Sequence, residues 1–172
     1  YGSEAVFESA RIDHASAAFD SSNGKVVIAY RGNSFHGTAI VGTVSGTSIS
    51  FGSSAVYNSA NTGYIGSAYV GSGKVVITYQ NDGDSAKGYV SVGTVSGTSI
   101  SFGTAVKFED ARTSHTSPTY DSTNGKVVIA YQDEGNSLYG TAIVGTVSGD
   151  SISFGSPFIF NPGTSWYMST AY

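Results

Sequence analysis

The sequence predicts an all-β protein built from repeats, and three observations support this prediction. A segment of roughly fifty residues occurs three times, which indicates one supersecondary unit stacked repeatedly. Its most constant part, Gly-Thr-Val-Ser-Gly-Thr-Ser-Ile-Ser-Phe-Gly, fills 42–52 and 93–103 and returns at 145–155 with one change, Asp150. Turn signals separate short apolar runs within each copy, and no stretch shows a convincing helical period.

Each copy is expected to contain four antiparallel strands. In the third copy they are expected at 117–121, 126–131, 140–147 and 151–154. The first strands of the other two copies are expected at 15–20 and 65–70. The second strand is apolar on both faces, so it should be covered on both sides. The fourth strand alternates between apolar and polar residues, which fits an outer, half-exposed strand.

The turn between the first two strands carries the strongest local signal. Asn23-Gly24 and Asn124-Gly125 stand between apolar runs, and Ser72-Gly73 is the weaker equivalent. Asn-Gly favours a two-residue hairpin turn, in which both residues need positive φ. Asp20 and Asp121, which precede this turn, are expected to be turn residues that bond nearby backbone.

A four-stranded antiparallel meander that repeats at this interval and is buried on both faces is typical of a β-propeller blade. The alternative is a β-trefoil, which also has three four-stranded repeats. On the propeller interpretation, residues 1–172 form a single repeat domain. Its segments are the end of a preceding blade at 1–14, blades at 15–64, 65–116 and 117–167, and the first strand of a further blade at 168–172.

Three full blades are fewer than a propeller ring usually contains. Both ends of the chain are therefore expected to expose unpaired faces or edges. These surfaces predict contacts with copies of the chain itself or with further blades of a longer chain.

Composition narrows the function classes. The net charge of −4 gives no basic footprint, so nucleic acid is not an expected partner. No apolar run approaches the length of a membrane span, so membrane insertion is not expected. The absence of cysteine excludes disulfides, thiolate metal sites and a cysteine nucleophile. A charged share of 12%, with many Tyr, Ser and Thr, suits an extracellular, cell-surface or virion-surface protein.

Two segments carry a resemblance to a known group of proteins. With Gly-Lys-Val-Val-Ile-Ala-Tyr at 24–30 and 125–131, and Val-Gly-Thr-Val-Ser-Gly-Thr-Ser-Ile-Ser-Phe-Gly at 41–52, the chain resembles tandem-repeat proteins of marine bacteria and their phages. Their repeats are interpreted as β-propeller blades, sometimes loosely as sialidase-like. The resemblance covers nearly the whole chain, and it implies an extracellular or virion-surface setting.

The sialidase comparison can be tested on one motif. The Asp-box of that family reads Ser-x-Asp-x-Gly-x-x-Trp, and Ser148-Gly149-Asp150 begins it. Ile152 stands where the motif requires Gly, and the other two copies have Thr at the Asp position. The catalytic residues of sialidases are therefore not carried over to this chain.

The connections from each fourth strand to the next first strand are the candidate ligand face. They vary among copies that share a scaffold, and such loops are free to specialise. The candidate ligand-binding residues are Arg11, His14, Asn61, Tyr64, Arg112, His115, Trp166 and Tyr167. Aromatic rings, arginines and histidines around one face suit a glycan or an anion. The alternative is packing between neighbouring units, with Arg11 paired to Asp13 or Glu8.

Catalysis and metal binding have weaker support. No carboxylate pair can be nominated for glycoside hydrolysis, so no enzyme activity is expected. The polar loops at 81–84 and 133–136 place carboxylates and amides around Gly, which makes calcium a minor alternative. The spacing of an EF-hand is absent, so no metal or other cofactor is expected.

The sequence thus predicts a non-catalytic, lectin-like propeller module, an adhesin that binds glycan or a cell-surface polysaccharide. One alternative is a structural, self-assembling unit of a fibre or surface layer. The second is a fragment of a sialidase-like glycoside hydrolase.

Overall fold

The protein is all-β, as predicted. The computed structural model describes residues 2–171. Strands make up 66% of the chain and form one antiparallel sheet of thirteen strands that does not close on itself. Residues 2–171 contain no α-helix, and no helix among them is long or apolar enough to cross a membrane. This open sheet confirms the all-β antiparallel class; it establishes neither a propeller ring nor a trefoil barrel.

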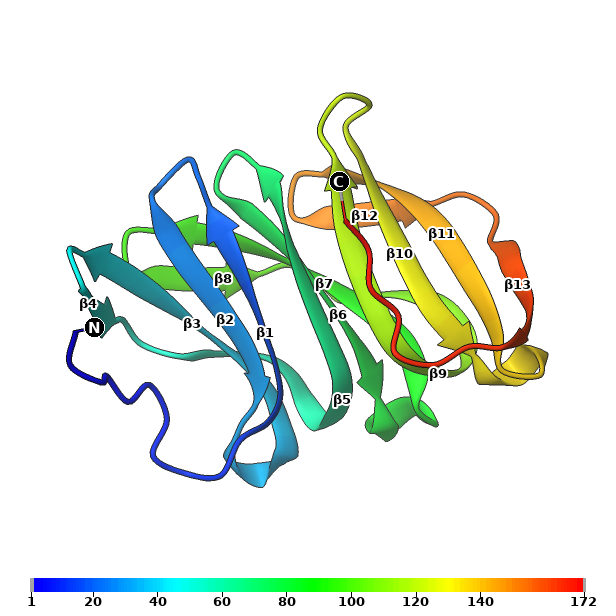
Figure 1. Cartoon of the computed structure of the whole chain (residues 1–172), viewed down its shortest axis with the longest axis horizontal. Coiled ribbons are helices and arrows are strands. Elements are labelled where there is room, and N and C mark those ends of the chain that lie inside the picture. The colour runs from blue at the N-terminus through cyan, green and yellow to red at the C-terminus, as the bar shows by residue number, and fades with distance from the viewer. Residues whose placement is uncertain (1, 172) are drawn as a thin grey trace.

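The strands follow one another along the chain with short connections (Figure 1). They are β1 (Asp13–Asp20), β2 (Lys25–Arg31), β3 (His36–Ser45), β4 (Ser48–Phe51), β5 (Ala55–Gly71), β6 (Lys74–Asn81), β7 (Lys87–Ser96), β8 (Ser99–Phe102), β9 (Val106–Asp121), β10 (Lys126–Asp133), β11 (Tyr139–Ser148), β12 (Ser151–Phe154) and β13 (Phe158–Thr164). Three short 3₁₀ turns stand between them, at Asn33–Phe35, Asp82–Asp84 and Glu134–Asn136.

The sheet divides into three similar units. Unit 1 consists of β1 to β4 with residues 55–61 of β5. Unit 2 consists of residues 62–71 of β5, β6 to β8 and residues 106–112 of β9. Unit 3 consists of residues 113–121 of β9 and β10 to β13. The expected first strands at 15–20, 65–70 and 117–121 all lie within strands of the structure.

The units stack with their sheet faces together, and two hydrophobic cores fill the spaces between them. Val75, Ile77 and Tyr79 of β6 belong to the core shared with unit 1. Val76 of the same strand belongs to the core shared with unit 3, with Val92 beside it. The second strand of the middle unit is therefore covered on both faces, as its double apolar pattern predicts.

The long strands β5 and β9 differ from the prediction. Each was expected to be a connecting loop followed by a strand, but each is one continuous strand that leaves one unit and enters the next. A register shift between Gly63 and Gly66, and a matching shift in β9, marks a β-bulge at each crossing. The bulge bends the strand towards the next unit while most of the backbone hydrogen bonding continues.

The hairpin turns also differ from the prediction. At Asn23-Gly24 and Asn124-Gly125 the loops span four residues, because Asp20 pairs with Lys25 and Asp121 with Lys126. Only the glycine of each pair has positive φ. The two-residue turn occurs instead at Ser72-Gly73, the weaker signal, where both residues have positive φ. A side-chain acceptor explains the longer loops: the Asp20 carboxylate accepts from the backbone N–H groups of Ser22 and Asn23, and Asp121 does the same in its own turn.

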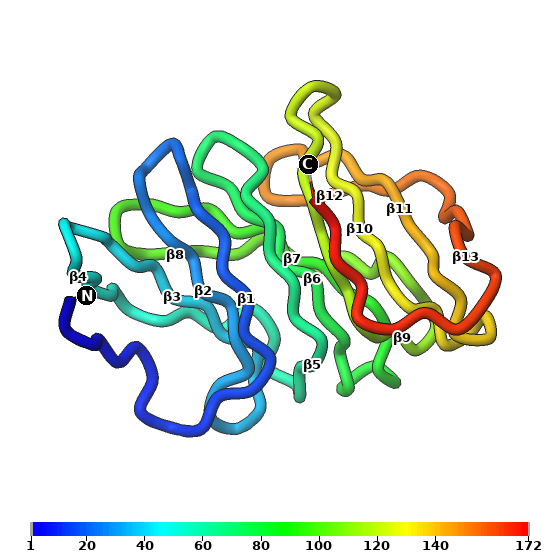
Figure 2. The backbone as a smooth tube through the Cα atoms, viewed as in Figure 1, coloured from blue at the N-terminus to red at the C-terminus, as the bar shows by residue number. Residues whose placement is uncertain are grey.

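The hairpin turns and the crossings between units lie at two opposite ends of the stack (Figure 2). We call the end that carries the turns at 21–24, 72–73 and 122–125 the hairpin end. At the other end lie the bulges of β5 and β9 and the three 3₁₀ turns, and we call it the crossing end. The candidate ligand-binding residues of the sequence all lie at or near the crossing end.

Candidate functional site

Four bulky residues occupy the same strained position at the crossing end. His14, Tyr64, His115 and Tyr167 have φ values of 49°, 47°, 51° and 51°. Left-handed backbone of this kind favours glycine, and a residue with a Cβ pays roughly 1 kcal/mol or more to adopt it. The repeat keeps a ring at all four positions although glycine would fit the backbone better. The rings must therefore contribute something that offsets this cost.

The four rings stand in a row that runs from unit to unit. The ring centroids of His14 and Tyr64 are 5.4 Å apart, those of Tyr64 and His115 are 4.7 Å apart, and those of His115 and Tyr167 are 5.0 Å apart. Trp166 stands edge-on to His115 at 5.7 Å. We call these five residues the ring row. Its rings are tilted by 49° to 75° to their neighbours, so they contact each other through edges as well as faces.

The ring row is only partly covered. Tyr64 and His115 are half-buried in the middle, whereas His14, Trp166 and Tyr167 are exposed at the two ends. Packing between units accounts for the middle rings, as the alternative interpretation of the sequence holds. It does not account for the exposed rings of Trp166 and Tyr167, which offer apolar surface to solvent.

The predicted polar partners are engaged in ion pairs and hydrogen bonds. Arg11 lies 3.3 Å from an oxygen of Asp13, as the packing alternative suggested. Arg112 Nε lies 2.9 Å from the Glu134 carboxylate. The third member of this position in the repeat, Asn61, donates to the Asp82 carboxylate at 2.7 Å. In these three cases a residue of the bulge region is tied to a neighbouring carboxylate.

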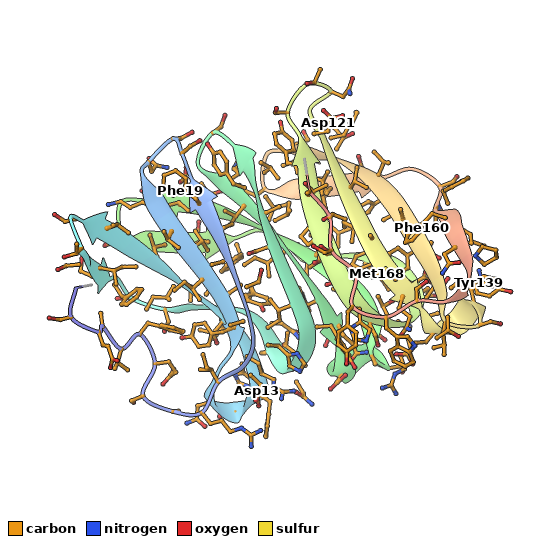
Figure 3. The ribbon with its side chains drawn as sticks, viewed as in Figure 1. Asp13, Phe19, Asp121, Tyr139, Phe160 and Met168 are labelled. Carbon is orange, nitrogen blue, oxygen red and sulfur yellow. The ribbon has the colours of Figure 1, made fainter. Side chains whose placement is uncertain are left out.

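A second arginine joins the first of these pairs. Arg31, at the end of β2, lies 2.9 Å from Asp13 Oδ2, so one carboxylate holds two guanidinium groups. These cations lower the pKa of Asp13, with Arg31 the largest cause. The Arg31 guanidinium also lies 5.5 Å from the centre of the exposed Phe35 ring. Figure 3 labels Asp13 at the crossing end, below β1 and β2.

A small pocket opens beside this cluster. It has a volume of about 160 Å³ and is lined by Arg11, Asp13, Gly32, Asn33, Ser34 and Phe35. The candidates chosen from sequence included Arg11 but missed Asp13, Arg31 and Phe35. One signal was present: Arg31 is a charged residue at a strand position where the other two copies carry Gln80 and Gln132.

The two histidines of the ring row are less basic than ordinary histidines. Burial, and then the charge of Arg31, lowers the pKa of His14 below the usual 6.5, even though part of this side chain stays exposed. Burial also lowers the pKa of His115. Both imidazoles are therefore neutral near pH 7, and the ring row presents uncharged aromatic surface.

The acidic loops at 81–84 and 133–136 serve local structure. Asn81 and Asp133 accept hydrogen bonds from backbone N–H groups of the 3₁₀ turns that follow them. Asp84 accepts a hydrogen bond from the Tyr89 hydroxyl at 2.7 Å and pairs with Lys87. No cluster of three or more metal-ligating side chains occurs among residues 2–171.

The aspartate of the partial Asp-box pattern has a role between units. Asp150 lies in the turn between β11 and β12, at the hairpin end, and accepts from Lys74 Nζ and Thr94 Oγ1 of unit 2, each at 2.8 Å. These bonds tie unit 3 to unit 2. Asp150 lies away from the ring row, which is at the opposite end of the stack.

The structure thus brings together five of the eight predicted site residues, His14, Tyr64, His115, Trp166 and Tyr167. The other three, Arg11, Asn61 and Arg112, hold carboxylates next to the row. Comparison of the chain with protein-family models, with curated proteins and with solved structures gives no match.

Proposed function

We propose that the protein is a non-catalytic binding module that takes a glycan along the ring row. The observation that carries the proposal is the retention of four large rings at positive φ, in one row, at the same position of every repeat. A purely structural bulge would be served at lower free energy by glycine or asparagine. A chain of neutral rings suits a chain of sugars, because the apolar face of a sugar packs on an aromatic ring.

The polar residues beside the row would supply orientation and specificity. Arg112 and Asn61 keep donor groups beside the rings, and the carboxylates of Glu134 and Asp82 hold them in place. A few placed polar groups next to apolar surface are typical of small-ligand sites. Because Arg112 is already paired, it should contribute less to binding than an unpaired arginine would.

The proposed glycan is neutral or weakly charged. The three arginines nearest the row are matched in number by three carboxylates, those of Asp13, Asp82 and Glu134, and the histidines are uncharged near pH 7. An extracellular, cell-surface or virion-surface setting accords with this proposal, since glycan chains are exposed there.

An array of immobilised oligosaccharides tests the proposal. Trp166→Ala should weaken binding to any captured glycan by about 1–3 kcal/mol, the range of aromatic anchors at interfaces. Arg112→Ala should weaken it by a smaller amount. Asn124→Ala, at the hairpin end, removes a hydrogen bond to Asp121 and should lower stability without changing affinity.

Two results would contradict the proposal. The first is an array on which no glycan is captured. The second is a loss of affinity from Asn124→Ala as large as that from Trp166→Ala, because the two residues lie at opposite ends of the stack.

A further inference from the structure

The same contact occurs at both interfaces between units, the one between units 1 and 2 and the one between units 2 and 3. Gly52 lies against the turn between β7 and β8, so closely that an added Cβ would overlap the carbonyl oxygen of Thr98. Gly103 lies in the same way against the carbonyl of Asp150, in the turn between β11 and β12. A glycine that directly follows the short fourth strand of one unit thus contacts the turn of the next unit.

An aromatic cluster repeats beside each of these contacts. Tyr57 of unit 1 packs on Tyr79 and Phe102 of unit 2, with ring centroids 5.1 Å and 5.6 Å apart. Phe108 of unit 2 packs on Tyr131 and Phe154 of unit 3. In both interfaces one ring, Tyr57 or Phe108, belongs to the earlier unit, and the two rings that it contacts belong to the later unit.

The outer face of unit 3 carries the earlier-unit half of this interface. Gly155 corresponds to Gly52 and Gly103, and its N–H bonds to Val144 as theirs bond to Val41 and Val92. An added Cβ on Gly155 would meet nothing closer than the Val144 carbonyl oxygen, 3.9 Å away. The backbone is therefore already in the docking conformation, and the space in front of it is open.

The side chains of this face are correspondingly exposed. Val144 is 46% exposed, whereas its equivalents Val41 and Val92 are 0% and 1% exposed. Phe160 is 49% exposed, whereas its equivalents Tyr57 and Phe108 are buried. Figure 3 labels Phe160 between β11 and β13. The outer face of unit 3 is thus apolar, and it resembles the faces of units 1 and 2 that are covered by the next unit.

The opposite face of the molecule carries the later-unit half. On unit 1, Tyr30 and Phe51 are the equivalents of Tyr79 and Phe102. Phe7 from the segment before β1 packs on both of them, at 5.2 Å and 5.6 Å. Gly2 lies against the carbonyl of Thr47, as Gly52 and Gly103 lie against their turns. Residues 2–7 therefore occupy the place that the segment after the fourth strand of another unit would take, as residues 52–57 do between units 1 and 2.

A second segment, residues 168–171, covers a surface of unit 3 on which another unit would stack. We call residues 2–7 and 168–171 the placeholders. Thr170 exchanges hydrogen bonds with Ser117 of β9, with the two hydroxyl oxygens 3.0 Å apart. Ser67 of unit 2 meets Ser16 of unit 1 in the same way, at 2.9 Å. Residues 168–171 thus stand where the first strand of another unit would stack, and Figure 2 shows this segment running along β9.

We propose that the outer face of unit 3 docks unit 1 of a second copy of this chain, head to tail. The occupant is specified by the contacts: this face offers a glycine, a ring and a valine, and unit 1 offers the turn and the two rings that fit them. Phe160 and Gly155 of one copy replace Phe7 and Gly2 of the next, and β1 of the next copy replaces residues 168–171. The contact is heterologous, so it builds a ring if it closes and a filament if it does not.

The internal interfaces also indicate how to strengthen this contact. At the interface between units 2 and 3, Asp150 binds Lys74 and Thr94. The equivalents at the free face are Lys126 and Thr146, whose side chains are 2.7 Å apart. Thr47 of the incoming copy occupies the place of Asp150 and offers no charge. Thr47→Asp would supply a carboxylate for Lys126 of the other copy.

Sedimentation velocity of the chain over the micromolar range tests the proposal. The wild-type mass should rise with concentration, and Gly155→Val should remain a monomer with an unchanged melting temperature, because its Cβ enters open space. Ser156→Val is the matched control: its equivalents Ser53 and Thr104 stay exposed in the internal interfaces, so it should associate like wild type. Thr47→Asp should associate at lower concentration, and added salt should cancel the gain.

Two outcomes would overturn the proposal. A wild-type chain that stays monomeric over the whole range shows that the placeholders satisfy both faces. Association of Gly155→Val equal to that of wild type shows that copies meet through another surface.

Discussion

The chain changes direction at both the hairpin end and the crossing end, but it does so with different kinds of residue. The hairpin end uses residues that suit the geometry: glycines at positive φ, with Ser72 as the exception, and aspartates that accept backbone hydrogen bonds. The crossing end places His and Tyr at positive φ, where they are strained. The hairpin end therefore contributes stability, whereas the crossing end gives up some stability to hold particular side chains in a row. This difference is the physical reason to look for function at the crossing end.

The largest effect on stability is expected from the removal of Asp20, the buried aspartate of a hairpin turn. Asp20 is fully buried and accepts hydrogen bonds from two backbone N–H groups and from the Asn23 amide. Asp20→Ala removes this buried acceptor from its three donors and should lower the free energy of unfolding by about 2–3 kcal/mol, measured by urea denaturation. Asp121→Ala is the control, because Asp121 accepts the same three hydrogen bonds but is only half-buried, and it should cost about 1 kcal/mol. Equal losses would mean that burial of the aspartate does not matter.

The strain at the crossing end can be measured by a pair of substitutions at one position. His115→Gly releases the backbone strain but loses contacts with Tyr64 and Trp166, so its net effect on stability should be small. His115→Val keeps the strain and loses the same contacts. The two variants should differ by about 1–2 kcal/mol in the free energy of unfolding, the cost of a Cβ in left-handed backbone.

A matched substitution at the hairpin end calibrates this value. Gly125 has φ of 66°, and an added Cβ would meet only the Tyr120 hydroxyl, 3.9 Å away, so Gly125→Val adds the backbone cost with little change in packing. It should lower stability by the same amount as the difference between His115→Val and His115→Gly. A much smaller difference at His115 would show that the bulge adjusts and stores no strain.

The sequence predicts the repeat more fully than it predicts the crossings. The apolar pattern of 26–30 and its equivalents identifies the strands and the double-sided burial of the middle unit, because these depend on periodicity within one copy. The strand character of β5 and β9 is missed, because it arises from pairing with two different units. At the hairpin turns, Asn-Gly points to a short loop, but the Asp20 carboxylate stabilises a longer one.

The sequence also predicts only part of the candidate site. Alignment of the repeats identifies the residues of the ring row, because rings recur at one position. Their stacking distances and positive φ cannot be deduced from sequence, since both depend on the bulge. Asp13 and Arg31 are missed because they come from different strands and meet only after β1 pairs with β2.

The ion pair of Asp150 offers a smaller test, since it joins two units at the hairpin end. The side chains of Lys74 and Asp150 keep partial exposure, and ion pairs that water reaches contribute little to stability. Asp150→Thr, which introduces the residue found in the other two copies, should therefore lower the free energy of unfolding only slightly. The loss should shrink in high salt, which urea titrations at two ionic strengths would measure. A larger loss that salt leaves unchanged would assign the effect to the shape of the turn.

The smallest expected effect is a dependence of stability on pH that belongs to the crossing end alone, because the loops at 21–24, 72–73 and 122–125 contain no histidine. Burial lowers the pKa of His14 and of His115 in the folded state below the usual 6.5. The unfolded chain therefore binds more protons as pH falls through this value, and the free energy of unfolding should decrease from neutral pH until the pH passes the folded pKa. The carboxylate of Asp13 stays ionised in this window, because its ion pairs hold its pKa below 3.8.

His115→Gln should flatten the curve of unfolding free energy against pH, and NMR titration of the imidazoles should show both pKa values below 6.5. A curve that His115→Gln and His14→Gln leave unchanged would mean that the ring row is as well hydrated as the unfolded chain.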